Sequence, residues 1–343
     1  MNKTINHAII GCGRIAQNHF NAAKINGINI ICCCDRDIEK AKAFAEKNGI
    51  EKYECDYKKL IKDESIDSVS VCTDHVSHTK IAEDFLGKKH IIIEKPLSSH
   101  TDLAKEFIEK SKKIKEKKVI TVISQHRFDY PVNLVKKIID SGDLGDITLV
   151  NAKLRCFRPD DYYTDSYWRG TVSQEGGSTV INQSYHIVDT LVYLFGMPNE
   201  VKSFSGNFKY KEKIETEDTC VSIFRYKNML CTFSSTNTSI LDWRTCIEVI
   251  GTKGEIRFTI DFPEEILEFN VDEKIKEKYK KDIEKINNNY KDNENSAVNY
   301  YGLSHNSQFE DFKKAILDGK QIKVGLNEAF ETQKTIGLIY KGE

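Results

Sequence analysis

The sequence has no long hydrophobic run, no Cys-x-x-Cys pair, only five prolines and a formal net charge of -1. A membrane-spanning helix needs about 18 consecutive apolar residues, so we expect no contact with a membrane. Because 51 lysines and arginines nearly cancel 52 aspartates and glutamates, no basic field is present to hold nucleic acid. The first apolar stretch is too short for a signal peptide, and we therefore expect a cytoplasmic protein.

The ten cysteines are spaced neither for zinc nor for a disulfide framework. Cys32, Cys33 and Cys34 stand in the apolar run INIICCCD, where free cysteine behaves as a small hydrophobic residue. We expect reduced thiols buried in a strand and no bound metal. With 39% apolar residues over 343 positions, the chain is long enough for two domains, each with its own core.

The segment HAIIGCGRIAQNHF begins with a strand pattern and continues with a helix pattern. Between the two, Gly11, Gly13 and Ala16 form a G-x-G-x-x-A fingerprint. Gly11 permits the tight turn, Gly13 lets the backbone approach a pyrophosphate, and Ala16 lets the helix pack closely on the strand. The start of the helix offers free N–H groups to the anion, so we expect Arg14 and Ile15 to contact a dinucleotide as well.

A second apolar run, residues 28–34, ends at Asp35, about 20 residues beyond the glycines. A carboxylate here hydrogen-bonds the ribose hydroxyls and repels a 2′-phosphate, which favours NAD over NADP. The next residue, Arg36, weakens that preference because a guanidinium can accept a phosphate. We expect NAD as the cofactor, with Asp35 and Arg36 beside its adenosine.

Helix and strand patterns alternate through residues 1–123, which we predict to be an α/β Rossmann domain. We expect strands over 7–10, 28–34, 68–72, 90–93 and 119–123, and helices over 14–24, 37–48, 77–86 and 101–117. Repeated β-α units predict a doubly wound parallel sheet that binds ligands at the carboxyl ends of its strands.

Two groups of polar residues follow strands at those ends. We expect Thr73, His75 and His78 to cap the next helix and to contact the cofactor, since a metal site would need a third ligand that the sequence does not supply. Lys95 comes directly after the buried run IIIE and is expected to point into the crevice where a nicotinamide binds.

The stretch EGGSTVINQSYHIVD, residues 175–189, places two glycines before a helical pattern. In one continuous helix, Asn182, His186 and Asp189 would share a face, because they are spaced i, i+4 and i+7. Most of the other helical positions are apolar, so this polar face is either a satisfied internal network or a site.

Three motifs occur in the order known from one family: Gly11-x-Gly13-x-x-Ala16, Glu94-Lys95-Pro96 and Gly176-Gly177…His186-x-x-Asp189. The whole chain resembles the glucose–fructose oxidoreductase/inositol dehydrogenase (Gfo/Idh/MocA) family. The resemblance implies a Rossmann domain that binds the cofactor with the first two motifs. It also implies an α+β C-terminal domain with an open antiparallel sheet, through which we expect a homodimer or homotetramer. Lys95 and His186 would flank the nicotinamide and the sugar carbon that is oxidised.

Two departures from the common family pattern concern the substrate. Asn182 replaces the usual aspartate and Ser184 a usual glycine, which argues against an inositol-type Asp–His pair and implies one fewer negative charge beside His186. The segments around residues 162–171 and 304–312 resemble the branch of UDP-N-acetylglucosamine and UDP-N-acetylglucosaminuronate 3-dehydrogenases. The resemblance gives these substrate contacts: Lys95, Gln125, Arg127, Tyr163, Trp168, Arg169, Asn182 and His186. Arg127 is equally open to a role in an interdomain ion pair.

We therefore predict an NAD-dependent oxidoreductase that oxidises the C3 hydroxyl of a UDP-N-acetylhexosamine or its uronate, for amino-sugar and surface-polysaccharide synthesis. His186 is assigned as the base because imidazole titrates near working pH, and Lys95 as the cation that stabilises the alkoxide. The residues leave open which of the two takes the proton. They also leave open a dehydrogenase of a free sugar or inositol, and a non-catalytic NAD-binding regulator.

Residues 124–343 are predicted to form the second domain. Its antiparallel sheet is expected from β-rich runs over 147–155, 201–210, 219–226, 229–237, 244–251 and 254–260. Helices are expected over 132–141, 305–318 and 326–341. The mixed charges of residues 264–297 predict a solvated insertion.

Overall fold

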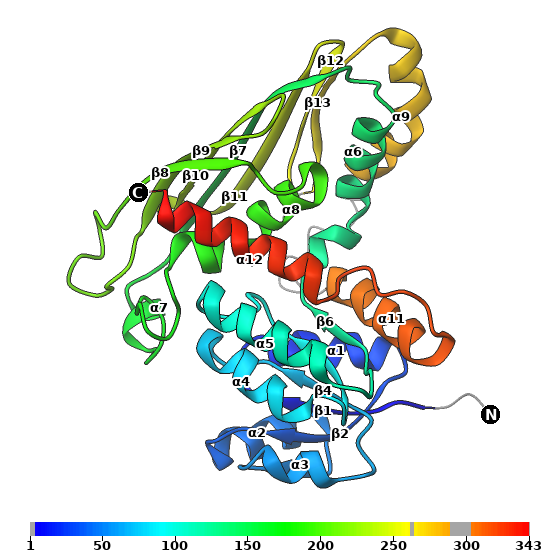
Figure 1. Cartoon of the computed structure of the whole chain (residues 1–343), viewed down its shortest axis with the longest axis vertical. Coiled ribbons are helices and arrows are strands. Elements are labelled where there is room, and N and C mark those ends of the chain that lie inside the picture. The colour runs from blue at the N-terminus through cyan, green and yellow to red at the C-terminus, as the bar shows by residue number, and fades with distance from the viewer. Residues whose placement is uncertain (1–3, 261–263, 289–302, 343) are drawn as a thin grey trace. The chain divides into compact units, whose positions relative to one another are not determined.

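The structure is a computed structural model of the chain and describes residues 4–260, 264–288 and 303–342. The chain divides into two compact units (Figure 1). Unit 1 comprises Met1–Gln125 and Gly302–Gln333, and unit 2 comprises His126–Tyr301 and Lys334–Glu343. Among the described residues, no helix has both the length and the apolar character that crossing a bilayer requires.

Unit 1 contains a six-stranded parallel sheet in the order β3-β2-β1-β4-β5-β6. Its strands are β1 (Asn6–Ile10), β2 (Asn29–Cys34), β3 (Lys52–Glu54), β4 (Ser68–Val71), β5 (His90–Ile93) and β6 (Ile120–Val122). Its helices are α1 (Ala16–Ile25), α2 (Ile38–Asn48), α3 (Lys58–Lys62), α4 (His75–Phe85), α5 (Thr101–Lys113) and α11 (Leu303–Asp318). The order and direction of the strands confirm the predicted Rossmann arrangement. The short elements β3 and α3 were not predicted.

Both faces of this sheet are buried, because alternate residues of each strand pack against different helices. Ile9 and Cys33 share a cluster with Ala16 of α1 and Phe44 of α2. Cys32 and Cys34 belong to the cluster on the other face, with α3, α4 and α5. This burial explains the continuous apolar runs and confirms that the three adjacent cysteines are core residues. All ten cysteines are free thiols.

Helix α11 corrects the predicted division of the chain, in which everything after residue 123 belonged to the second domain. Phe309 and Phe312 of α11 are fully buried in one cluster with Ala22 and Ala23 of α1. This apolar contact returns residues 302–333 to unit 1. The helix boundaries themselves agree with the expectation, as do those of α12 (Leu326–Lys341), which begins in unit 1 and ends in unit 2.

Unit 2 contains a seven-stranded sheet in the order β13-β12-β11-β7-β10-β9-β8. The strands are β7 (Ile147–Phe157), β8 (Glu200–Gly206), β9 (Thr219–Arg225), β10 (Leu230–Thr236), β11 (Thr238–Gly251), β12 (Gly254–Phe258) and β13 (Ile266–Asn270). The sheet is open, but the expectation of a wholly antiparallel sheet was wrong, since β7 and β10 pair in parallel. A parallel pair needs a long crossover rather than a hairpin, and more than seventy residues separate these two strands.

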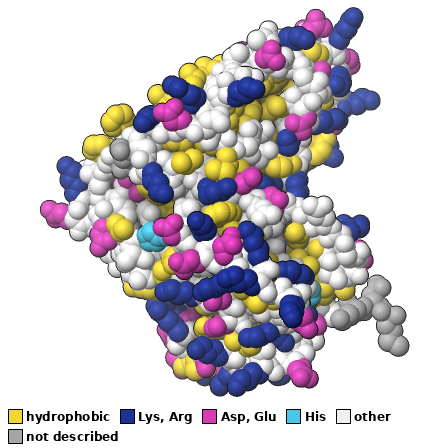
Figure 2. All heavy atoms as spheres, in the orientation of Figure 1, with side chains coloured by type: hydrophobic (Ala, Val, Ile, Leu, Met, Phe, Trp, Pro, Cys, Tyr) yellow, Lys and Arg dark blue, Asp and Glu magenta, His cyan; other side chains and the backbone are white. Residues whose placement is uncertain are grey.

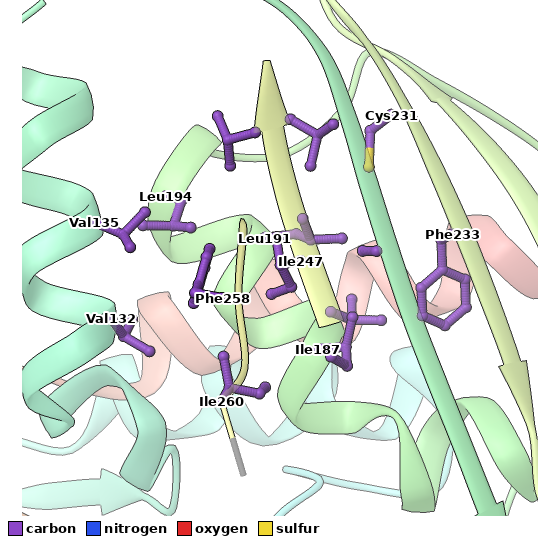
Figure 3. Close-up of a cluster of buried hydrophobic side chains, with 14 of the residues drawn as sticks. Val132, Val135, Ile187, Leu191, Leu194, Cys231, Phe233, Ile247, Phe258 and Ile260 are labelled. Atoms are coloured by element: carbon purple, nitrogen blue, oxygen red, sulfur yellow. The ribbon is translucent and has the colours of Figure 1, made fainter. Parts of the chain in front are cut away.

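Helices cover the inner face of this sheet. Figure 3 shows α6 (Tyr130–Asp140) and α8 (Tyr185–Phe195) directing Val135, Leu191 and Leu194 toward sheet residues such as Phe258. Outside the core are two short helical segments, η1 (Gln125–Phe128) and α7 (Asp161–Thr164). The apolar positions of α6 and α8 are thus explained by burial against the strands.

The polar segment before α8 is not the continuous helix that its spacing predicts. Thr179–Gln183 forms a π-helix, η2, and α8 starts afresh at Tyr185. The N–H and the hydroxyl of Ser184 both bond to the carbonyl oxygen of Thr179, each at 2.9 Å. The π-helical turn therefore precedes and interrupts the α-helix, so Asn182 and His186 do not lie on one continuous α-helix.

Residues 264–288 correct the predicted solvated insertion. They form β13, which pairs with β12, and α9 (Glu273–Asn288). Tyr279 and Ile286 of α9 are buried in the core cluster, and the Tyr279 hydroxyl donates to Asp143 at 2.7 Å. Residues 273–288 are rich in charges of both signs, and the amphipathic pattern of α9 was therefore not recognised in the sequence. The rest of the predicted insertion, residues 289–297, lies outside the described residues.

Candidate active site

The glycine loop of unit 1 joins β1 to α1 at the carboxyl end of the sheet. Gly11 has a φ of 91°, and a Cβ there would lie 2.6 Å from the carbonyl oxygen of Cys72, so only glycine fits. Gly13 has open space where a Cβ would stand. The N–H groups of Gly13, Arg14 and Ile15 have no hydrogen-bond acceptor among the described residues. This exposed turn suits the close approach of a pyrophosphate.

Asp35 follows β2 and is half-buried. Its Oδ2 accepts the N–H of Cys12 at 2.9 Å, and its Oδ1 accepts the N–H of Asp37 at 3.0 Å. The carboxylate therefore ties the glycine loop to the end of β2 and remains at the edge where the ribose was expected. Arg36 beside it is exposed.

Residues 73–78 follow β4 and begin α4. Asp74 caps this helix by accepting the N–H of Ser77 at 3.1 Å. Both ring nitrogens of His78 face backbone carbonyl oxygens, Nδ1 at 2.8 Å from Pro96 and Nε2 at 3.1 Å from Thr73. Because both ring nitrogens are engaged, His78 joins two loops and has no nitrogen available for a metal or a cofactor. The side chain of Thr73 is half-buried.

Lys95 is half-buried, while its neighbours Glu94, Pro96 and Leu97 are buried. The N–H of Lys95 donates to its neighbour's carboxylate, Glu94 Oε2, at 2.9 Å. The lysine thus projects from a backbone that is fixed on both sides of it.

In unit 2, His186 lies on the first turn of α8 and is 2% exposed. Its ring stands edge-on to that of His126, with the centroids 4.7 Å apart and the planes at 81°. His126 Nδ1 hydrogen-bonds Asp129 Oδ2 at 2.5 Å. This imidazole–carboxylate pair was not predicted from the sequence, although the HRFD spacing places both residues near the start of α6.

Asn182 is bonded to a carboxylate that the sequence analysis also missed. Its Nδ2 donates to Glu175 Oε1 at 2.5 Å, and the N–H of Gly170 donates to Glu175 Oε2. Burial raises the pKa of Glu175 to about 7, against those two hydrogen bonds, and the nearby Glu217 carboxylate adds to the rise. Position 182 carries Asn instead of the aspartate that is usual in the family, but Glu175 places a carboxylate beside it. This carboxylate has a pKa of about 7.

The position of Tyr340 of α12 explains why residue 177 is a glycine. A Cβ on Gly177 would lie 1.9 Å from the Tyr340 hydroxyl. That hydroxyl donates to Glu217 Oε1 at 3.0 Å, and the same carboxylate accepts the N–H groups of Ser178 and Val180. Gly177 thus lets Tyr340 and Glu217 hold the turn that leads to Asn182.

Asp189 and Arg127 form a buried ion pair within unit 2. Arg127 Nη2 lies 2.8 Å from Asp189 Oδ1 and its Nε 3.0 Å from Oδ2, with both residues at most 4% exposed. The guanidinium is bound in a two-pronged arrangement. The structure therefore gives Arg127 a partner in its own unit.

Tyr162 lies under two guanidinium groups. Arg169 Cζ is 4.2 Å and Arg158 Cζ 5.1 Å from the centroid of the Tyr162 ring. Arg169 also lies 5.3 Å from the Trp168 ring. The Tyr162 hydroxyl accepts hydrogen bonds from Asn182 and Gln183, so these cations connect to the polar turn.

Tyr163 and Gln125 are less accessible than predicted. Tyr163 is 3% exposed, and its hydroxyl bonds with Ser178 and Asn237. Burial raises the pKa of this phenol. Gln125 is 2% exposed and closes the first segment of unit 1. The half-buried Tyr162, and not Tyr163, presents its ring to the arginines.

Two family models match the chain over most of its length. One, described as "Oxidoreductase family, NAD-binding Rossmann fold", matches residues 5–123, and the other, "GFO/IDH/MocA C-terminal domain", matches residues 132–257. The chain belongs to the Gfo/Idh/MocA family. This oxidoreductase accordingly uses NAD and is of the sugar dehydrogenase type that acts on CH–OH groups.

Individual relatives of this Gfo/Idh/MocA chain are distant. YrbE of Bacillus subtilis, an uncharacterised oxidoreductase, is 26% identical over 262 residues, covering 74% of this chain and 73% of that protein. The myo-inositol 2-dehydrogenase of Thermotoga maritima is 25% identical over 256 residues, covering 72% and 73%. The WlbA dehydrogenase of Bordetella pertussis, crystallised with NADH and UDP-GlcNAcA, has a TM-score of 0.88 at 22% identity, covering 100% of this chain and 96% of that one.

The residues of unit 1 fit NAD. The unengaged N–H groups at the start of α1 suit the pyrophosphate, and Asp35 stands at the end of β2 where a ribose is recognised. When bound, NAD accepts the hydride removed from the substrate carbon. Two clusters of potential metal ligands occur among the described residues, His19–Glu94–His305 and His126–Asp129–Glu264. In each, an imidazole already bonds to a carboxylate.

Proposed function

We propose that this enzyme oxidises the C3 hydroxyl of a UDP-N-acetylhexosamine or its uronate, in the cytoplasm, as a step toward amino sugars of surface polysaccharides. The observation that carries the proposal is the pair of guanidinium groups on Tyr162, joined through Gln183 to the segment that bears Asn182. Guanidinium binds phosphate and carboxylate in two-pronged fashion, and an anionic sugar nucleotide offers both. The fold-level likeness to WlbA, whose crystals hold UDP-GlcNAcA, supports the same substrate class.

Each residue has one task in this proposal. His186 accepts the proton of the sugar hydroxyl, and the Lys95 ammonium stabilises the developing alkoxide. Arg169, Arg158 and Trp168 hold the anionic part of the substrate. Asn182, held by Glu175, orients the sugar by a hydrogen bond.

A free sugar or inositol is the second candidate substrate. The Thermotoga maritima relative is a myo-inositol 2-dehydrogenase, and an Escherichia coli relative at 28% identity is a D-glucoside 3-dehydrogenase. A substrate without phosphate would leave the Arg158–Tyr162–Arg169 group without a task in binding, which ranks this candidate second.

A panel of substrates tests the proposal. The enzyme is mixed with NAD and, separately, UDP-N-acetylglucosamine, its uronate, glucose or myo-inositol, while the absorbance of the reduced cofactor is followed. We expect turnover with one or both UDP-sugars. Replacing Arg169 by Gln should raise KM for that sugar by about 10-fold or more with a smaller change in kcat, since an ionic contact to the part of the substrate that does not react acts mainly in binding. Turnover of inositol or glucose alone would refute the nucleotide-sugar assignment, and no turnover with bound NADH would favour the regulator.

We also propose that the enzyme is a homodimer or homotetramer joined through the outer face of the unit 2 sheet. Phe204, Val221 and Ile223 on neighbouring strands β8 and β9 are 84%, 51% and 53% exposed. Figure 2 shows hydrophobic side chains exposed over this region. Such a patch is typical of an interface. Light scattering should give a multiple of the 39.4 kDa chain mass, and Ile223→Lys should lower it; a monomeric wild type would contradict the proposal.

A further inference from the structure

Beneath Lys95, unit 1 contains a continuous row of buried polar groups that the glycine fingerprint does not explain. The row lies on the face of the sheet covered by α1 and α11. In order it runs through Ser68, His7, Ser70, His19 and Glu94. All five residues are at most 4% exposed. Buried polar groups are costly unless paired, so such a row has to be satisfied throughout.

The hydrogen bonds of the row can all be satisfied without a charged imidazole. His7 Nε2 and His19 Nδ1 lie 2.8 and 2.9 Å from the Ser70 hydroxyl, which can accept one hydrogen bond and donate the other. His19 Nε2 is then free to carry a proton and donates it to Glu94 Oε1 at 2.9 Å. One direction of donation therefore runs toward the Glu94 carboxylate.

Protonation agrees with this direction. Burial lowers the pKa of His19, and this outweighs the opposing effect of Glu94. Burial on its own would raise the pKa of Glu94, but the hydrogen bond from His19 and the nearby imidazole of His305 hold this pKa well below its usual range. These two pKa shifts agree with an ionised Glu94 carboxylate that accepts an N–H from a neutral His19 imidazole.

The other oxygen of Glu94 reaches the catalytic segment. Glu94 Oε2 accepts the N–H of Lys95 at 2.9 Å, and His78 bonds the carbonyl oxygen of Pro96 at 2.8 Å. His305 of α11 brings its Nε2 to 3.6 Å from Glu94 Oε1. The backbone on both sides of Lys95 is thus tied to α1, α4 and α11.

We propose that His19 and Glu94 are positioning residues for Lys95: the carboxylate, oriented by the imidazole of α1, fixes the backbone from which the ammonium projects. The inference rests on the proposed role of Lys95 in the reaction. A displacement of about 1 Å at a reacting group can cost 10²-fold in rate, so fixing this backbone matters for kcat more than for binding.

The test compares His19→Asn and Glu94→Gln with a matched control, His7→Asn. His7 is as buried as His19 and also bonds two groups, but it contacts neither Glu94 nor Lys95. Glu94→Gln is nearly isosteric and keeps the test possible if His19→Asn fails to fold. For each variant we would measure kcat, both KM values, thermal unfolding, and NADH binding by fluorescence titration without substrate.

We expect kcat to fall by about 10-fold or more in His19→Asn and Glu94→Gln, with NADH affinity and both KM values within about 3-fold. His7→Asn should lose comparable thermal stability and keep its kcat within about 2-fold. If kcat follows stability equally in all three variants, or does not change in any, the proposal is overturned. Normal turnover by Lys95→Ala would instead refute the role of Lys95 itself, and this inference with it.

Discussion

We expect His186→Asn to have a kcat about 100-fold or more below that of the wild type, because a positioned general base contributes roughly 10²–10⁴-fold. We expect the kcat of Lys95→Ala to fall by about the same factor, since removing one group that stabilises an oxyanion costs about 10²–10³-fold in kcat. The two losses have different origins. Each variant should bind NADH with an affinity within a few-fold of that of the wild type, as measured by fluorescence titration.

The control for this pair is Lys112→Gln, an exposed site on α5 whose ammonium lies 2.9 Å from Glu109. It should retain the wild-type kcat. Circular dichroism of all variants separates loss of catalysis from loss of fold. Wild-type turnover in both His186→Asn and Lys95→Ala would mean that the polar residues are purely structural and that the reaction uses other groups.

We expect Asp189→Asn to lower the free energy of unfolding by about 3–5 kcal/mol, the usual cost of removing one partner from a buried ion pair. Arg127 is 4% exposed and Asp189 1% exposed, so the guanidinium cannot exchange its lost partner for water. Denaturation by urea, followed by fluorescence, measures the change.

Two comparisons make this second prediction specific. Glu109→Gln breaks the exposed pair with Lys112 on α5 and should change stability by less than about 1 kcal/mol. The double variant Arg127→Met/Asp189→Leu removes both charges and should recover most of the loss, because no charge is left buried alone. A loss below about 1 kcal/mol in Asp189→Asn would contradict the assignment of this ion pair to structural stability.

Unit 1 could be predicted closely because its signals are local. A buried run followed by a capped helix has the same meaning wherever it occurs: α2 begins after Asp37, whose carboxylate accepts the N–H of Glu39, and ends at Gly49 with a φ of 68°. The strand β3 escaped notice because three residues carry too little periodicity to be distinguished from a loop.

The site of unit 2 was predicted only in part. Spacing identified Asn182, His186 and Asp189, but in the structure Asn182 belongs to a π-helix that precedes α8, and Asp189 is paired with Arg127. Glu175 and His126 were not predicted as site residues, because Glu175 meets Asn182, and His126 meets His186, through the fold and not through helical spacing. A rule based on i, i+4 positions cannot anticipate a contact made by a loop.

By itself, the sequence determined the family, the Rossmann domain and the glycine loop, and it singled out Lys95 and His186 as the candidates for catalysis, because these depend on local periodicity and on motifs whose chemistry is carried by neighbouring residues. Only the tertiary structure decided which carboxylate accompanies Asn182, which unit receives α11, and how β7 and β10 pair. Those outcomes depend on burial: a buried polar or apolar group is stable only beside a partner, and that partner can come from any part of the chain.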